Sequence, residues 1–128
     1  MQTPQFTLTT LLDFAAAHRL HGYDGDCARL HGHNWKVEVH VRGTQLDEVG
    51  MVMDFKAIKR HAREVVAELD HTYLNDHPFF QTRNPTAENL ALFLFQKLSE
   101  RINNDRCHVV GITVWENDRN RVTLGERG

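Results

Sequence analysis

Apolar and polar residues alternate along two early stretches of the chain, the pattern of a β-strand with one buried face. In residues 6–14, one parity carries apolar residues or threonine, which predicts a strand that runs towards His18. The clearest alternation covers residues 33–42, where Trp35, Val37, Val39 and Val41 alternate with Lys36, Glu38, His40 and Arg42. We therefore predict two neighbouring strands at the start of the fold.

After Asp54, a good helix N-cap, the period of the pattern becomes helical. The apolar positions there are Phe55, Ile58, Ala62, Val65, Val66 and Leu69. A connection over 70–84 leads to a second helix, opened by Asn84-Pro85-Thr86. Strands over 108–116 and 121–124 complete the order ββααββ. This order predicts an α+β fold with both helices packed on one face of an antiparallel sheet.

The chain has 128 residues, a length typical of one domain, and we expect a single domain over 1–128. Fifteen Lys and Arg against seventeen Asp and Glu give a net charge of −2 without runs of like charge. This balance argues against electrostatic capture of nucleic acid or of an anionic membrane. Two cysteines are too few for a disulfide scaffold, and no stretch has the composition of a signal peptide or a membrane span. We expect a soluble, cytoplasmic protein.

Nine histidines stand out in this composition, because neutral imidazole is the commonest side-chain metal ligand. His31 and His33 are two residues apart, so on a strand they share the face of Trp35. Zinc needs a third protein ligand, and His18 at the end of the preceding strand is the natural candidate. His21 is the alternative.

Cys27 precedes His31 and His33 and has two possible roles. It is either a fourth zinc ligand, or a thiolate base or nucleophile beside a site of three histidines with an open position. Cys107 has no such neighbours in the sequence, and we interpret it as a buried, inert thiol.

Two acidic residues also carry candidate chemistry. Asp70 precedes His71, and a carboxylate beside an imidazole can make a proton shuttle. Adjacent side chains often point apart, however, and the pair then marks only a helix end and a loop. Glu116 is in phase with three apolar residues of its strand, so its carboxylate either reaches solvent at the strand end or meets a partner. An aminopyrimidinone edge, with two adjacent N–H donors, would be such a partner.

These residues occur within six motifs that resemble the 6-pyruvoyl-tetrahydropterin synthase family, most closely its bacterial 6-carboxy-tetrahydropterin synthase branch. The three residues between Cys27 and His31 match that branch, whereas Trp115 stands where relatives often carry lysine. In chain order the motifs are Phe14-Ala15-Ala16-Ala17-His18-Arg19-Leu20, Cys27-x3-His31-Gly32-His33, Gly50-x3-Asp54-Phe55, Leu69-Asp70-His71-x-Tyr73-Leu74-Asn75-Asp76, Asn84-Pro85-Thr86-x-Glu88 and the late Glu116.

The resemblance implies the tunnelling fold (T-fold), a ββααββ unit that assembles around a central barrel, with active sites between the subunits of a homohexamer. It also implies a role for each candidate residue. The zinc ligands are His18, His31 and His33; Cys27 is the catalytic thiol; Asp70 and His71 form the proton-transfer dyad; Glu116 anchors the pterin ring; and Thr86 lines the pterin pocket.

The activity that the resemblance implies is a zinc-dependent lyase reaction in queuosine and 7-deazaguanine biosynthesis. The expected substrate is 7,8-dihydroneopterin triphosphate, and the expected products are 6-carboxy-5,6,7,8-tetrahydropterin, acetaldehyde and triphosphate. One alternative is a pyruvoyl synthase, which eliminates triphosphate without cleaving the side chain. Another is a non-catalytic zinc- or pterin-binding module, in which the histidines only stabilise the fold.

Overall fold

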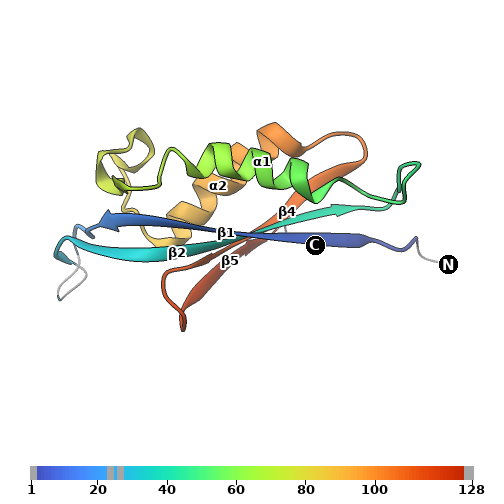
Figure 1. Ribbon diagram of the computed structural model, residues 1–128. Coiled ribbons are helices and arrows are strands. Elements are labelled where there is room, and N and C mark those ends of the chain that lie inside the picture. The colour runs from blue at the N-terminus through green and yellow to red at the C-terminus, as the bar shows by residue number, and fades with distance from the viewer. Residues whose placement is uncertain (1–2, 23–24, 26–27, 126–128) are drawn as a thin grey trace.

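The computed structural model describes residues 3–22, 25 and 28–125. Figure 1 shows one sheet with two helices on the same side of it. In chain order the elements are β1 (Phe6–His18), β2 (His31–Gly43), α1 (Phe55–Val66), β3 (Thr72–Tyr73), two 3-10 helices (Leu74–Asp76 and Pro78–Phe80), α2 (Ala87–Ile102), β4 (Cys107–Trp115) and β5 (Arg121–Gly125). The predicted α+β class and the order of the two long strands, two helices and two late strands are confirmed.

The sheet has the strand order β3-β1-β2-β4-β5. The pairs β1–β2, β2–β4 and β4–β5 are antiparallel, as predicted. The fifth strand was not predicted: β3 lies inside the expected connection 70–84 and pairs in parallel with Ala16 and Ala17 of β1. Two residues are too few to show a periodic pattern, which is why the sequence does not reveal this strand.

The core lies between the sheet and the two helices. Trp35 and the three valines of β2 that share its face are fully buried, as are Ile58 of α1 and Leu94 of α2. Asp54 caps α1 by accepting a hydrogen bond from the Lys56 backbone N–H at 2.8 Å. Phe55 differs from the other apolar positions of the helical pattern, because this first residue of α1 is 54% exposed and borders a surface groove of about 190 Å³.

The opposite face of the sheet is polar. His40 there lies between two threonine hydroxyls, 2.9 Å from Thr9 Oγ1 and 3.1 Å from Thr113 Oγ1. The Trp115 indole N–H donates to Glu38 at 2.6 Å. Polar residues therefore occupy the face that the alternation in β2 assigned to them. None of the helices in the described ranges is long and apolar enough to cross a membrane.

The strand register gathers several candidate residues at one end of the sheet. His18 lies opposite His31, and Ala16 lies opposite His33, in the β1–β2 pair. On the other side of β2, Lys36 lies opposite Trp115, the last residue of β4. Glu116 follows directly, and its backbone N–H donates to the Asn120 carbonyl at 3.1 Å, which closes the turn into β5.

Candidate metal centre

Three histidines and one glutamate form a cluster at this end of the sheet. One ligand atom from each of His18, His31, His33 and Glu116 lies within 4.8 Å of all the others. The Nε2 atoms of His18 and His31 are 3.0 Å apart. Oε1 of Glu116 lies 3.5 Å from Nε2 of His18 and 3.4 Å from Nε2 of His33. The structure thus brings together the three predicted ligands and adds the Glu116 carboxylate to them.

Backbone carbonyl groups orient two of the three imidazole rings. Nδ1 of His18 lies 2.7 Å from the Pro85 carbonyl oxygen, and Nδ1 of His31 lies 2.7 Å from the Arg29 carbonyl oxygen. A carbonyl oxygen can only accept, so each Nδ1 donates, and each neutral ring presents the lone pair of Nε2 to the cluster. Sequence reasoning missed Pro85 and Arg29, because they act through backbone carbonyl groups, which every residue has.

The Nε2 atoms of the cluster lack ordinary hydrogen-bond partners. Two lone pairs only 3.0 Å apart repel each other unless a proton or a cation lies between them. Nε2 of His33 is buried and has no hydrogen-bond partner within the described part of the chain. A buried polar atom left unpaired is costly, and a bound cation would remove that cost.

The spacing of these atoms fits a metal ion. In a tetrahedral zinc site, metal–nitrogen bonds of about 2.0–2.1 Å place neighbouring ligand atoms about 3.3 Å apart. The contacts of 3.0, 3.4 and 3.5 Å in the cluster are close to that value. Three imidazole nitrogens with one carboxylate oxygen are also a donor set that suits divalent zinc. The residues present therefore fit a metal ion.

The surroundings of His18 and His33 favour the neutral form of these two rings. Burial, the largest effect, lowers the pKa of His18 and the pKa of His33 below 6.5. The neighbouring His31 lowers both pKa values further, whereas the Glu116 carboxylate acts in the opposite direction. Neutral rings are the form that binds a metal ion, so the fold favours the binding form near neutral pH.

Asp70 and His71 lie beside each other at the outer edge of β1. Oδ1 of Asp70 accepts from the Ala15 backbone N–H at 2.9 Å, and the His71 backbone N–H donates to the Ala15 carbonyl at 2.6 Å. Oδ2 of Asp70 lies 3.6 Å from Nε2 of His71, whose side chain is 82% exposed. The two side chains thus approach each other, and His71 has a φ of 58°.

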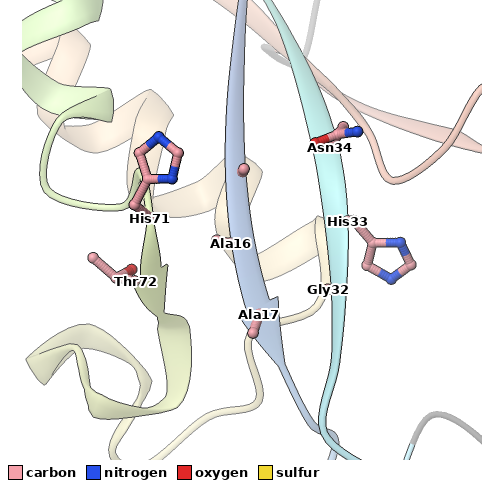
Figure 2. A pocket seen from close by; sticks show the side chains of 8 residues that line it. Ala16, Ala17, Gly32, His33, Asn34, His71 and Thr72 are labelled. Atoms are coloured by element: carbon pink, nitrogen blue, oxygen red, sulfur yellow. The ribbon is translucent and has the colours of Figure 1, made fainter.

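The structure does not bring this pair into the histidine cluster of the same chain. A shallow groove of about 400 Å³ runs over β1 and β2 and is bordered by both His71 and His33. Figure 2 shows the two rings on opposite sides of β1, with the His33 ring pointing away from His71. Within one chain, β1 therefore lies between the His71 ring and the His33 ring, and His71 is not part of the histidine cluster.

The remaining predicted residues have different outcomes. Cys27 lies outside the described residues. Thr86 is the N-cap of α2, and its hydroxyl accepts from the Asn89 backbone N–H at 3.1 Å, so its part in a substrate pocket stays a prediction. Cys107 is a free, buried thiol, as expected, and burial raises its pKa.

Comparison with known proteins gives matches over nearly the whole chain. Residues 7–127 match the 6-pyruvoyl tetrahydropterin synthase family. A putative 6-carboxy-5,6,7,8-tetrahydropterin synthase of Archaeoglobus fulgidus is 48% identical over 88 residues, which are 69% of this chain and 71% of that protein. The 6-carboxy-5,6,7,8-tetrahydropterin synthase of Synechocystis sp. is 44% identical over 92 residues, covering 68% and 70% of the two chains.

A solved structure extends the comparison to the fold. The 6-pyruvoyl tetrahydropterin synthase of Caenorhabditis elegans has a TM-score of 0.86 at 31% identity and covers 99% of both chains. Relatives with the carboxy name and relatives with the pyruvoyl name therefore both resemble this chain.

Proposed function

Because the chain belongs to the 6-pyruvoyl tetrahydropterin synthase family, we propose that it is a zinc-dependent carbon–carbon lyase of the 6-carboxy-tetrahydropterin type. The substrates are 7,8-dihydroneopterin triphosphate and one water molecule, and the products are 6-carboxy-5,6,7,8-tetrahydropterin, acetaldehyde and triphosphate. The observation that carries the proposal is the cluster of three histidines and Glu116. The carboxy-named relatives at 48% and 44% identity support this product over the pyruvoyl one.

In this proposal His18, His31 and His33 hold the metal ion. A bound zinc ion supplies Lewis-acid stabilisation of negative charge on the side-chain oxygens of the substrate. The carbonyl groups of Pro85 and Arg29 keep two of the rings turned so that Nε2 faces that position. Because metal ligands oriented in this way need no reorganisation, the backbone contacts contribute to affinity.

The other candidate residues bind the ring and move protons. The Glu116 carboxylate accepts hydrogen bonds from two adjacent N–H groups of the pterin and so fixes the side chain at the metal. Cys27 acts on one face of the substrate, where its thiolate removes a proton or its thiol delivers one. His71 does so on the other face, with Asp70 3.6 Å away to hold its tautomer. Thr86 lines the pterin pocket.

We further propose that two copies of the chain complete each active site, within a homohexamer. The separation of His71 from the histidine cluster supports this, because a dyad that serves the metal site must then come from another subunit. Among the described residues, β3 pairs only with Ala16 and Ala17, and Asp70 and His71 bond to Ala15, which leaves the outer edge of β1 over residues 6–14 for a neighbouring subunit. Each subunit forms a single domain, and the assembly acts in the cytoplasm within queuosine and 7-deazaguanine biosynthesis.

A second candidate is the pyruvoyl activity on the same scaffold. The likeness to the C. elegans pyruvoyl synthase, over 99% of both chains, favours it. The deciding experiment is mass analysis of the products after incubation of the zinc-loaded protein with 7,8-dihydroneopterin triphosphate. Carboxy-tetrahydropterin with acetaldehyde supports the lyase, and a pyruvoyl product transfers the protein to the second candidate. If no product forms although zinc is bound, the substrate assignment is wrong and a binding module remains.

Replacement of the proposed thiol separates its two possible roles. Cys27→Ala should abolish turnover and leave zinc bound, because the three histidines suffice as ligands. Loss of zinc from this variant, measured by metal analysis after gel filtration, would make Cys27 a ligand instead.

A further inference from the structure

The segment that follows His18 leaves the sheet, yet its peptide groups are paired. The Asn75 side chain accepts from the Arg19 backbone N–H at 3.0 Å and donates to the Arg19 carbonyl at 2.9 Å. The Asn84 side chain accepts from the His21 backbone N–H at 2.9 Å and donates to the His21 carbonyl at 2.9 Å. Each carboxamide therefore satisfies both peptide groups of one residue.

This arrangement imitates a neighbouring strand. In a β-strand, residues two apart present their N–H and C=O groups towards the same edge, and the two asparagines likewise pair with residues two apart, Arg19 and His21. Only a side chain with both a donor and an acceptor can make such a pair; a carboxylate can only accept, and alanine does neither. The side chains of Arg19 and His21 themselves are exposed, so side-chain burial does little to hold this segment.

The same asparagines connect to the histidine cluster. Asn84 is followed by Pro85, whose carbonyl accepts from Nδ1 of His18 at 2.7 Å. The Asn84 carbonyl accepts from the Asn89 side chain at 2.8 Å, which links it to the first turns of α2. Asn84 and Pro85 thus contact the chain at two points, the ring of His18 and the backbone of His21.

We propose that Asn75 and Asn84 are positioning residues of the metal site. They fix the segment 19–21, so that the ring of His18, immediately before it, keeps Nδ1 on Pro85 and Nε2 towards the cluster. The inference rests on the proposed role of His18 as a metal ligand. Without either asparagine, the chain after His18 is no longer held in place. The His18 imidazole then also adopts orientations in which Nε2 does not point towards the cluster.

The test compares Asn84→Ala, Asn84→Asp and Asn75→Ala with the unaltered full-length protein. Affinity for Zn²⁺ is measured by competition with a chromophoric chelator, and the geometry of the site by the visible absorption spectrum after loading with Co²⁺. Changes to groups that orient metal ligands typically cost 10–100-fold in affinity, and we expect a loss of about this size for Asn84→Ala. Asn84→Asp keeps the acceptor and should lie between Asn84→Ala and the unaltered protein.

Asn104→Ala is the matched control. The Asn104 side chain also accepts from backbone N–H groups, those of Arg106 and Cys107, at the start of β4 and away from the histidines. The Asn104→Ala substitution should lower the midpoint of thermal unfolding without changing the Zn²⁺ affinity or the Co²⁺ spectrum. A merely structural role of Asn75 and Asn84 predicts this same result for their variants.

The possible outcomes separate the two proposals. If the three variants bind Zn²⁺ as tightly as the unaltered protein and share its Co²⁺ spectrum, the positioning role is refuted and the metal site stands. If the unaltered protein itself binds neither metal, the proposed metal site fails, and the positioning role fails with it. Should Asn84→Ala not fold, as judged by circular dichroism, Asn84→Asp and Asn75→Ala decide by the same criteria.

Discussion

Replacing Glu116 by glutamine asks whether its carboxylate holds the substrate ring or the metal ion. The Glu116 side chain is 31% exposed, and one carboxylate oxygen lies 3.4–3.5 Å from two histidine nitrogens, a position compatible with both roles. Catalytic zinc sites generally use three protein ligands and leave a fourth position open. We therefore expect the three imidazoles alone to hold the ion, and the carboxylate to serve the pterin.

The size of the effect follows from the hydrogen bonds that change. Glutamine keeps one acceptor oxygen but turns an amide donor towards the second N–H of the ring, so at least one hydrogen bond to a charged group is lost. Such a bond contributes about 1.5–3 kcal/mol, and kcat/KM should fall about 10- to 150-fold. Zinc affinity should change less than about tenfold, because the three histidines remain.

Steady-state kinetics of the zinc-loaded variant and chelator competition for Zn²⁺ measure the two effects separately. Glu38→Gln is the control, since Glu38 accepts a hydrogen bond from Trp115 on the opposite face of the sheet. A fall of about 10–100-fold in zinc affinity with an unchanged KM would refute the reasoning and make Glu116 a metal ligand.

Further predictions concern metal content, packing and pH. Treatment with a chelator should abolish turnover and lower the midpoint of thermal unfolding, with both restored by Zn²⁺; an unchanged midpoint would contradict a metal ion held by the folded state. Leu94→Ala, in the fully buried stripe of α2, should lower the free energy of unfolding in urea by about 2–5 kcal/mol, and a loss below about 1 kcal/mol would contradict the packing described. Burial, Arg101 and Arg60 lower the pKa of His61 below its ordinary value of 6.5. As the pH falls, His61 is therefore protonated in the unfolded chain before it is protonated in the folded protein. The neutral His61 side chain contributes its full stabilisation above pH 6.5, and this contribution is lost as the pH falls towards the pKa of the folded state. In His61→Gln the free energy of unfolding should depend less steeply on pH below 6.5, and equal slopes in both proteins would exclude this role.

Much of the fold could be predicted because burial leaves a periodic trace in the sequence. The alternation around Trp35 and the helical stripe before Leu69 correspond to β2 and α1. The exposed Phe55 shows the limit of this reasoning. A helical pattern of apolar residues does not tell whether other elements cover the first turn of the helix. The family was likewise predicted from motif order and is confirmed by the match over residues 7–127.

The site was predictable only where side chains carry the chemistry. Strand pairing allowed His18 to be placed with His31 and His33, and the structure brings these three together. Pro85 was missed as an orienting group, because it acts through its carbonyl, which every residue has. The position of His71 relative to the histidines could not be inferred either, since it depends on how β3 joins the edge of β1.

The φ of 58° at His71 combines a strained backbone with the proposed proton carrier at a single position. Residues other than glycine and asparagine are disfavoured by about 1–2 kcal/mol in this left-handed region, and His71 adopts it with its imidazole exposed. Glycine at this position would relax the backbone and remove the proposed proton carrier at the same time. Selection of a variant library for thermal stability alone should therefore enrich glycine or asparagine at position 71. The selected proteins should be more stable and should lack the proposed proton carrier.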